Sequence, residues 1–275
     1  MAKKKNTNEM SFLDHLEDLR WLLVRCTMSI LIGAIIAFFF TDFIFDNIIF
    51  GPKDPNFITY RWFCDASKFF GSDGEGFCDL KMNFSVQSRV MSGQLNAHIW
   101  TAITAGFIIA FPFILWELWK FISPALYDKE KRGAKLFIFI SSILFFLGVM
   151  FGYFIITPLS INFLAGYEIS SQIHNDIDLD SYISLIRSTS ISCGLVFELP
   201  IVMFFLSKMG LVTPPFLRKY RRYAIVIILI IAAIVTPPDV VSQITVSIPL
   251  LILYEASIFI SGWVLKTKQK NEQLS

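Results

Sequence analysis

Six stretches of apolar residues, separated by polar segments, organise the chain. They cover residues 21–40, 99–121, 136–156, 183–206, 223–236 and 240–265. A helix rises about 1.5 Å per residue, so about twenty apolar residues cross the ~30 Å hydrocarbon core of a bilayer. Only the stretch 223–236 is shorter than this, at ~21 Å. The pattern predicts an all-α integral membrane protein with six transmembrane helices.

A helical repeat precedes the first apolar stretch, within residues 1–20. Phe12, Leu13, Leu16 and Leu19 fall on one face of the segment SFLDHLEDLR, and charged residues occupy the rest. This pattern is typical of an amphipathic helix that lies at the membrane surface. We therefore expect a basic tail and a surface helix that leads into the first span.

The polar segments between the spans differ in length and composition. We expect one membrane domain over residues 1–275, with two outer loops, two inner connections, a short outer turn and a C-terminal tail. In chain order these segments are 41–98, 122–135, 157–182, 207–222, 237–239 and 266–275. The first outer loop contains many aromatic residues, which predicts a packed cap rather than a disordered segment.

Composition and charge support this arrangement. Apolar residues make up 55% of the chain and charged residues only 17%, against about 25% charged in soluble domains. With both termini placed in the cytoplasm, 18 of the 24 Lys and Arg fall on the inner side, as the positive-inside rule requires. A net charge of +2 gives no electrostatic reason to expect a nucleic-acid partner.

An acidic residue interrupts the fourth stretch. Glu198 lies near its middle, and Pro200 follows two residues later. A carboxylate at membrane depth costs at least ~2.5–3.5 kcal/mol on insertion scales, so such residues are functional candidates. Proline removes a backbone hydrogen bond and favours a kink. The alternative is a neutral Glu198 that is hydrogen-bonded inside the helix bundle.

The four cysteines fall into two groups. Cys26 and Cys193 lie in or beside apolar stretches, as small core residues do. Cys64 and Cys78 both lie in the first outer loop, and they could form a disulfide if that loop faces an oxidising compartment. No cysteine or histidine cluster has the spacing of metal ligands, so we expect no metal site.

The sequence carries no sign of catalysis. It lacks a nucleotide-binding loop and the usual hydrolase motifs, and its three histidines are scattered. Two acids on the inner side, Asp18 and Glu130, could together form an anionic pocket that binds a guanidinium group. Alternatively they are solvated surface acids with local basic partners.

Four segments carry a family resemblance. They are FLDHLEDLR, WKFISPALYDKEKR, FELPIVMFFLSKMGLVTP and TPPDVVSQ, spread in order over nearly the whole chain. Together they make the chain resemble the TatC family, the multi-spanning subunit of the twin-arginine protein translocase. The long first outer loop with its two cysteines departs from the family pattern.

The resemblance implies a six-helix cup with a concave groove, in the bacterial cytoplasmic (inner) membrane. Its inner rim would bind the paired arginines of a folded cargo's signal peptide, and its groove would hold TatA- and TatB-like single-span subunits. Export would use the proton motive force without a cofactor, and the assembled receptor would contain several copies of the chain. The matching rim residues are Asp18, Arg20, Phe121, Pro124, Tyr127, Glu130 and Arg132. The matching groove residues are Glu198, Thr236, Asp239 and Gln243.

Two other functions are compatible with six spans. In a proton- or ion-coupled transporter of small solutes, Glu198 would change protonation during transport. A lipid-facing insertase would bind apolar segments without any dependence on arginine. The sequence shows no convincing internal repeat of the kind found in many transporters. The motifs above favour neither of these two functions.

Overall fold

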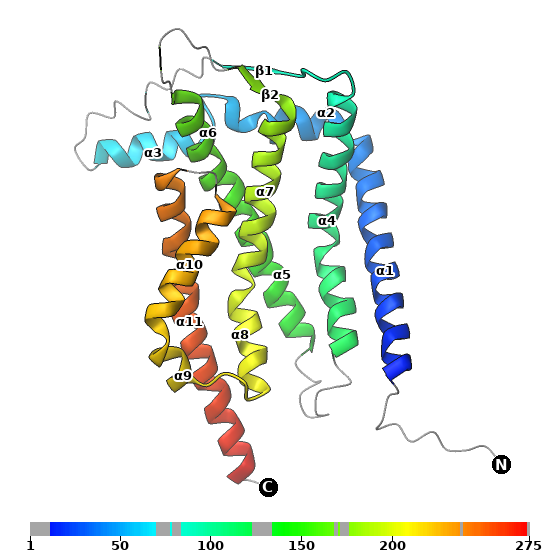
Figure 1. Ribbon diagram of the computed structural model, residues 1–275, viewed down its shortest axis with the longest axis vertical. Coiled ribbons are helices and arrows are strands. Elements are labelled where there is room, and N and C mark those ends of the chain that lie inside the picture. The colour runs from blue at the N-terminus through cyan, green and yellow to red at the C-terminus, as the bar shows by residue number, and fades with distance from the viewer. Residues whose placement is uncertain are drawn as a thin grey trace, which may run out of the picture. The chain divides into compact units, whose positions relative to one another are not determined.

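The computed structural model describes residues 12–69, 78, 84–122, 134–167, 170, 176–236 and 239–273. These residues are almost entirely helical (Figure 1). They form two compact units, one from residues 1–40 and 99–142, and the other from residues 41–98 and 143–275. We call these unit 1 and unit 2 and describe each by itself.

Unit 1 contains α1 (Phe12–Phe39), most of α4 (Gly93–Ile122) and the first half of α5 (Ala134–Phe151). The backbones of α1 and α4 touch at Gly33 and Gly106. A Cβ atom on Gly106 would lie 2.5 Å from the backbone nitrogen of Ala34, closer than real Cβ contacts allow. Glycine at this crossing therefore sets the distance between the two helices, as small residues do in membrane bundles.

The membrane part of unit 2 combines the second half of α5 with seven further elements. They are η5 (Gly152–Ile156), α6 (Thr157–Gly166), α7 (Leu179–Phe197), α8 (Leu199–Lys208), α9 (Pro214–Lys219), α10 (Arg221–Val235) and α11 (Val240–Gln273). Its core contains Ile156, Ile228, Ala232 and Leu250, all buried. Helices α10 and α11 form a hairpin at the C-terminal end of the chain (Figure 1).

The first outer loop contributes small elements to unit 2. They are α2 (Thr41–Phe43), η1 (Ile44–Ile49), η2 (Gly51–Lys53), α3 (Ile58–Phe69) and β1 (Ser85–Gln87). Strand β1 pairs in parallel with β2 (Asp176–Asp178), with Val86 opposite Ile177. The loop is thus folded over its described residues, as its aromatic content predicts.

Five helical segments of the described chain are long and apolar enough to cross a membrane. They are His15–Phe39, Gly93–Ile122, Leu136–Gly166, Leu179–Lys208 and Val240–Trp263. The predicted short fifth span corresponds to α10, which has only fifteen residues. These helices agree with the predicted all-α membrane fold.

Several predicted boundaries were wrong. Residues 12–20 do not form a separate surface helix, because α1 runs unbroken from Phe12 to Phe39 and no Gly or Pro occurs in it before Gly33. The helical segment of the third span continues through α6 to Gly166, past the predicted end at residue 156, since Pro158 occupies the first turn of α6, where proline is tolerated. Likewise, α4 starts at Gly93 rather than residue 99, and α11 continues to Gln273 rather than ending at residue 265. Finally, the predicted single domain is divided into two units.

Candidate functional site

The N-terminal end of α1 and the C-terminal end of α4 lie side by side in unit 1. The ring of His15 stacks on Phe121, with centroids 4.5 Å apart. One turn further along α1, Asp18 and Arg20 are exposed, and the Arg20 guanidinium lies 5.4 Å from the ring centre of Trp21. The described parts of the two predicted rim segments are therefore in contact, and the carboxylate of Asp18 beside them is open to a ligand.

The remaining rim residues cannot be placed in the same way. Pro124, Tyr127, Glu130 and Arg132 fall in the segment 123–133, which lies outside the described residues. Their predicted roles stay predictions.

An ion pair that sequence reasoning missed joins α1 to α4. The Nε atom of Arg25 lies 3.0 Å from Oε2 of Glu117. The Glu117 side chain is only 7% exposed, while that of Arg25 is 44% exposed. The signal was present, because both residues fall inside predicted apolar stretches, where a charge needs a partner. The pair joins the two helices between the stack of His15 on Phe121 and the Gly33–Gly106 crossing.

The kink predicted in the fourth span is confirmed in unit 2. Glu198 ends α7 and precedes α8, and Pro200 lies in the first turn of α8. The backbone carbonyl of Glu198 accepts hydrogen bonds from Ile201 and Val202, each at 3.0 Å. The Glu198 side chain is buried, at 9% exposure. A carboxyl group is therefore held inside the helix bundle at a break in the helix.

The polar residues of the α10–α11 hairpin shape its outer end. The Asp239 carboxylate accepts the backbone N–H of Ser242 at 2.6 Å, which makes Asp239 the N-cap of α11. The Thr236 hydroxyl donates to the carbonyl of Ala232 at 2.9 Å, at the end of α10. The Gln243 side chain donates to the carbonyl of Leu229 across the hairpin, at 3.3 Å. Three of the four predicted groove residues thus make structural contacts within the hairpin.

A short polar chain ties the hairpin to α6. The Ser160 hydroxyl lies 2.9 Å from that of Ser242 and 3.4 Å from the Asp239 carboxylate. All three residues are buried. Sequence reasoning did not find Ser160, because a single serine in an apolar segment carries no distinct signal.

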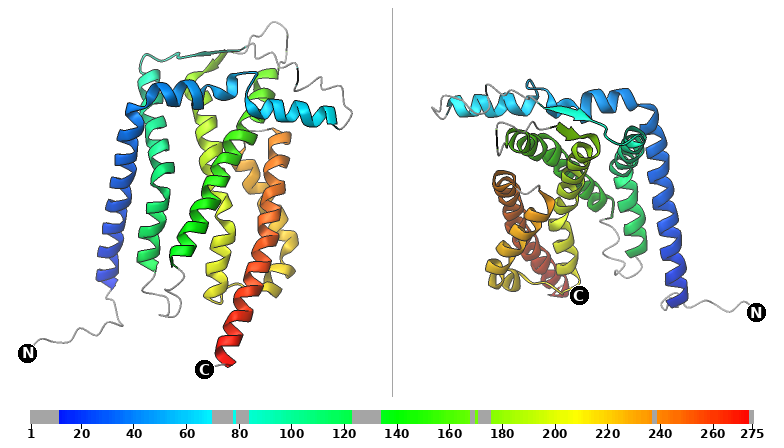
Figure 2. Two further views of the ribbon diagram at one scale, coloured as in Figure 1. Left: turned by 180° about the vertical axis from the view of Figure 1, so that it is seen from behind. Right: turned by 45° about the horizontal axis from the view of Figure 1, so that its top comes forward.

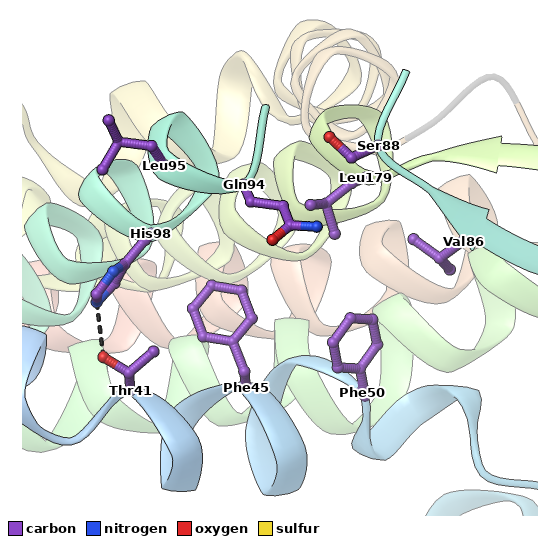
Figure 3. A pocket seen from close by; sticks show the side chains of 9 residues that line it. All are labelled: Thr41, Phe45, Phe50, Val86, Ser88, Gln94, Leu95, His98 and Leu179. Atoms are coloured by element: carbon purple, nitrogen blue, oxygen red, sulfur yellow. Dashed lines mark hydrogen bonds between the residues drawn. The ribbon is translucent and has the colours of Figure 1, made fainter. Parts of the chain in front are cut away.

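The outer elements of unit 2 enclose a hollow of about 480 Å³ (Figure 3). At one end, Nε2 of His98 lies 2.6 Å from the hydroxyl of Thr41, as Figure 3 shows. Phe45 and Phe50 project into the hollow from η1 and its end. The loop also contains the disulfide between Cys64 and Cys78, while Cys26 and Cys193 are free and buried.

Comparison with known proteins decides the family. The family model for Sec-independent protein translocase protein (TatC) matches residues 14–249. The chain belongs to the TatC family. It is 44% identical to a TatC of Blattabacterium over 96% of this chain and 100% of that protein. A TatC of Aquifex aeolicus is 36% identical over 96% of this chain and 98% of that protein.

A solved TatC structure has the same fold. A crystal structure described as the twin arginine translocase receptor TatC matches 91% of this chain and 99% of its own, with 35% identity and a TM-score of 0.68. The TatC resemblance and the predicted all-α membrane fold are thereby confirmed. The protein is a multi-pass protein of the bacterial inner membrane and a component of a protein translocase.

Proposed function

We propose that the chain is the signal-peptide receptor of its translocase and the subunit on which the complex assembles. It recognises paired arginines at the inner ends of α1 and α4. It docks TatA- and TatB-like single-span subunits beside α8 and the α10–α11 hairpin, for export of folded proteins driven by the proton motive force.

The observation that carries the proposal is the stack of His15 on Phe121. It holds the turn that bears Asp18 against the last turn of α4, and Glu130 follows Phe121 by nine residues in the sequence. Two carboxylates at one rim would suit two neighbouring guanidinium groups, because each could form a charge-assisted hydrogen bond. A lysine pair would lack the planar two-pronged contact.

Partner docking has a separate support. Glu198 places a buried carboxyl group at the break between α7 and α8. A partner helix with a polar side chain would find a hydrogen-bonding group at that depth, which lipid cannot supply. Docking would leave the hairpin contacts of Asp239 intact, since Asp239 is buried beneath the surface.

The test is binding of a signal peptide to the purified protein in nanodiscs, with an Arg-Arg peptide and its Lys-Lys twin. Asp18→Asn and Glu130→Gln remove one carboxylate each, and Glu17→Gln is the matched control, because Glu17 is an exposed acid next to Asp18. Loss of a charge-assisted hydrogen bond worth about 1.5–3 kcal/mol weakens binding about 10- to 100-fold. We expect that loss for the two rim variants and near wild-type binding for Glu17→Gln. Equal binding of the twin peptides to wild type would overturn the receptor role.

A further inference from the structure

Within unit 2, helix α3 of the first outer loop is attached to η5 and α6. The Thr59 hydroxyl donates a hydrogen bond to the carbonyl of Phe154 in η5. The Tyr60 hydroxyl, which is buried, bonds to the carbonyl of Pro158 at 3.2 Å. Phe57, just before α3, stacks on Phe154 with centroids 5.8 Å apart. The N-terminal half of α3 is therefore fixed to the third span.

The points of attachment lie at the outer edge of the hydrocarbon layer. The third span starts at Leu136, and Phe154 and Pro158 follow that residue by ~27 Å and ~33 Å along a helix. A hydrocarbon core of ~30 Å ends between these two positions. A second marker agrees, because the outer end of the α10–α11 hairpin contacts Ser160, two residues beyond Pro158.

The orientation of α3 fits the same level. Figures 1 and 2 show α3 lying across the direction of α6 and α11, with its C-terminal half extending sideways past α6. A helix parallel to the membrane plane that leaves the helix bundle at the hydrocarbon edge meets lipid rather than bulk water.

The exposed surface of α3 is amphipathic along its length. Ile58, Trp62 and Phe69 are 45%, 60% and 86% exposed, and they fall within about 40° of one another around the helix. Arg61 and Lys68 are exposed on one edge of this apolar face. Asp65, also exposed, lies between that basic edge and the apolar face. The disulfide at Cys64 leaves from the opposite side, about 160° from Trp62.

We propose that α3 is an interfacial helix whose apolar face lies in the outer leaflet, with Arg61 and Lys68 at the level of the lipid phosphates. The partner of this surface is the phospholipid bilayer. Trp and Phe favour the boundary between acyl chains and headgroups, and a basic edge complements anionic headgroups. The Cys64–Cys78 link and the Tyr60 contacts hold the helix with that face outward.

The test measures the environment of Trp62 in nanodiscs of phosphatidylethanolamine and phosphatidylglycerol. The Trp62 emission is obtained as the difference between wild type and Trp62→Phe. Its quenching is recorded with lipids brominated near the headgroup end of the acyl chain and, separately, with acrylamide in the water. Gln87→Trp in the Trp62→Phe background is the matched control, because Gln87 is exposed on β1, at the other end of the outer loop.

We expect brominated lipid to quench the Trp62 emission at least twofold and acrylamide to quench it weakly, with the reverse for Trp at position 87. Replacement of Arg61 and Lys68 by Gln should raise the acrylamide quenching of Trp62 about twofold, because the helix would sit less deeply. Two results would overturn the proposal. Strong acrylamide quenching without lipid quenching would place the face in water, and quenching by neither agent would show that protein covers it.

Discussion

Removing the charges of the Arg25–Glu117 pair one at a time should have unequal effects. Loss of one partner of a fully buried ion pair costs about 3–5 kcal/mol, mostly because the other charge stays buried. In Arg25→Gln the buried carboxylate of Glu117 loses its cation. Because Arg25 is 44% exposed and its charge is partly screened, we expect a smaller loss of stability, about 1.5–2.5 kcal/mol. In Glu117→Gln the exposed guanidinium stays hydrated and keeps an oxygen acceptor, so we expect about 1 kcal/mol or less.

The assay is reversible unfolding in mixed micelles with increasing SDS, followed by far-ultraviolet circular dichroism. The double variant completes the cycle and should be within about 0.5 kcal/mol of Glu117→Gln alone, since removing the arginine matters only while the carboxylate is charged. Equal losses for the two single variants would refute the reasoning. So would a double variant whose loss equals the sum of the two, because the charges would then not be coupled.

Three other predictions follow from the packing. Gly106→Ala should force α1 and α4 apart and cost about 1–3 kcal/mol of stability. Gly262→Ala should be neutral or stabilising, because a Cβ there meets nothing within 4 Å. Similar melting temperatures for the two variants would contradict the close crossing. Asp239→Ala should lose the N-cap of α11 and about 1–2 kcal/mol, while Asp239→Asn keeps most of it; equal thermal stability of these two variants would argue against capping. Alkylation of the denatured, unreduced protein should label two thiols by mass and four after reduction, because Cys64 and Cys78 are paired; four adducts before reduction would exclude the pair.

Local chemistry explains what the sequence predicted well. The kink next to Glu198 follows from Pro200, which cannot donate the backbone hydrogen bond that a continuous helix requires. The Cys64–Cys78 pairing was foreseen as one option because both residues lie in one outer loop. In each case the predicted feature depends on residues close together in the chain.

The contacts between distant helices could not be predicted in the same way. Arg25 and Glu117 are 92 positions apart, and they meet only because the Gly33–Gly106 crossing sets the register of α1 against α4. The burial of Asp239 could not be predicted for a related reason. The capping bond from Ser242 is local, because the two residues are three positions apart. The burial of Asp239, in contrast, depends on Ser160 of α6, which is distant in the sequence.

The break at Glu198 divides one membrane crossing between two sets of neighbours. Helix α7 packs chiefly on η5, whereas α8 packs chiefly on α11, and Ser207 of α8 bonds to Ser261 of α11 at 2.8 Å. Any displacement of α11 would therefore carry α8 with it, and the bend at Glu198 would absorb the movement before it reached α7. The fourth crossing therefore consists of two helices joined by a hinge, with the carboxyl group of Glu198 at the hinge.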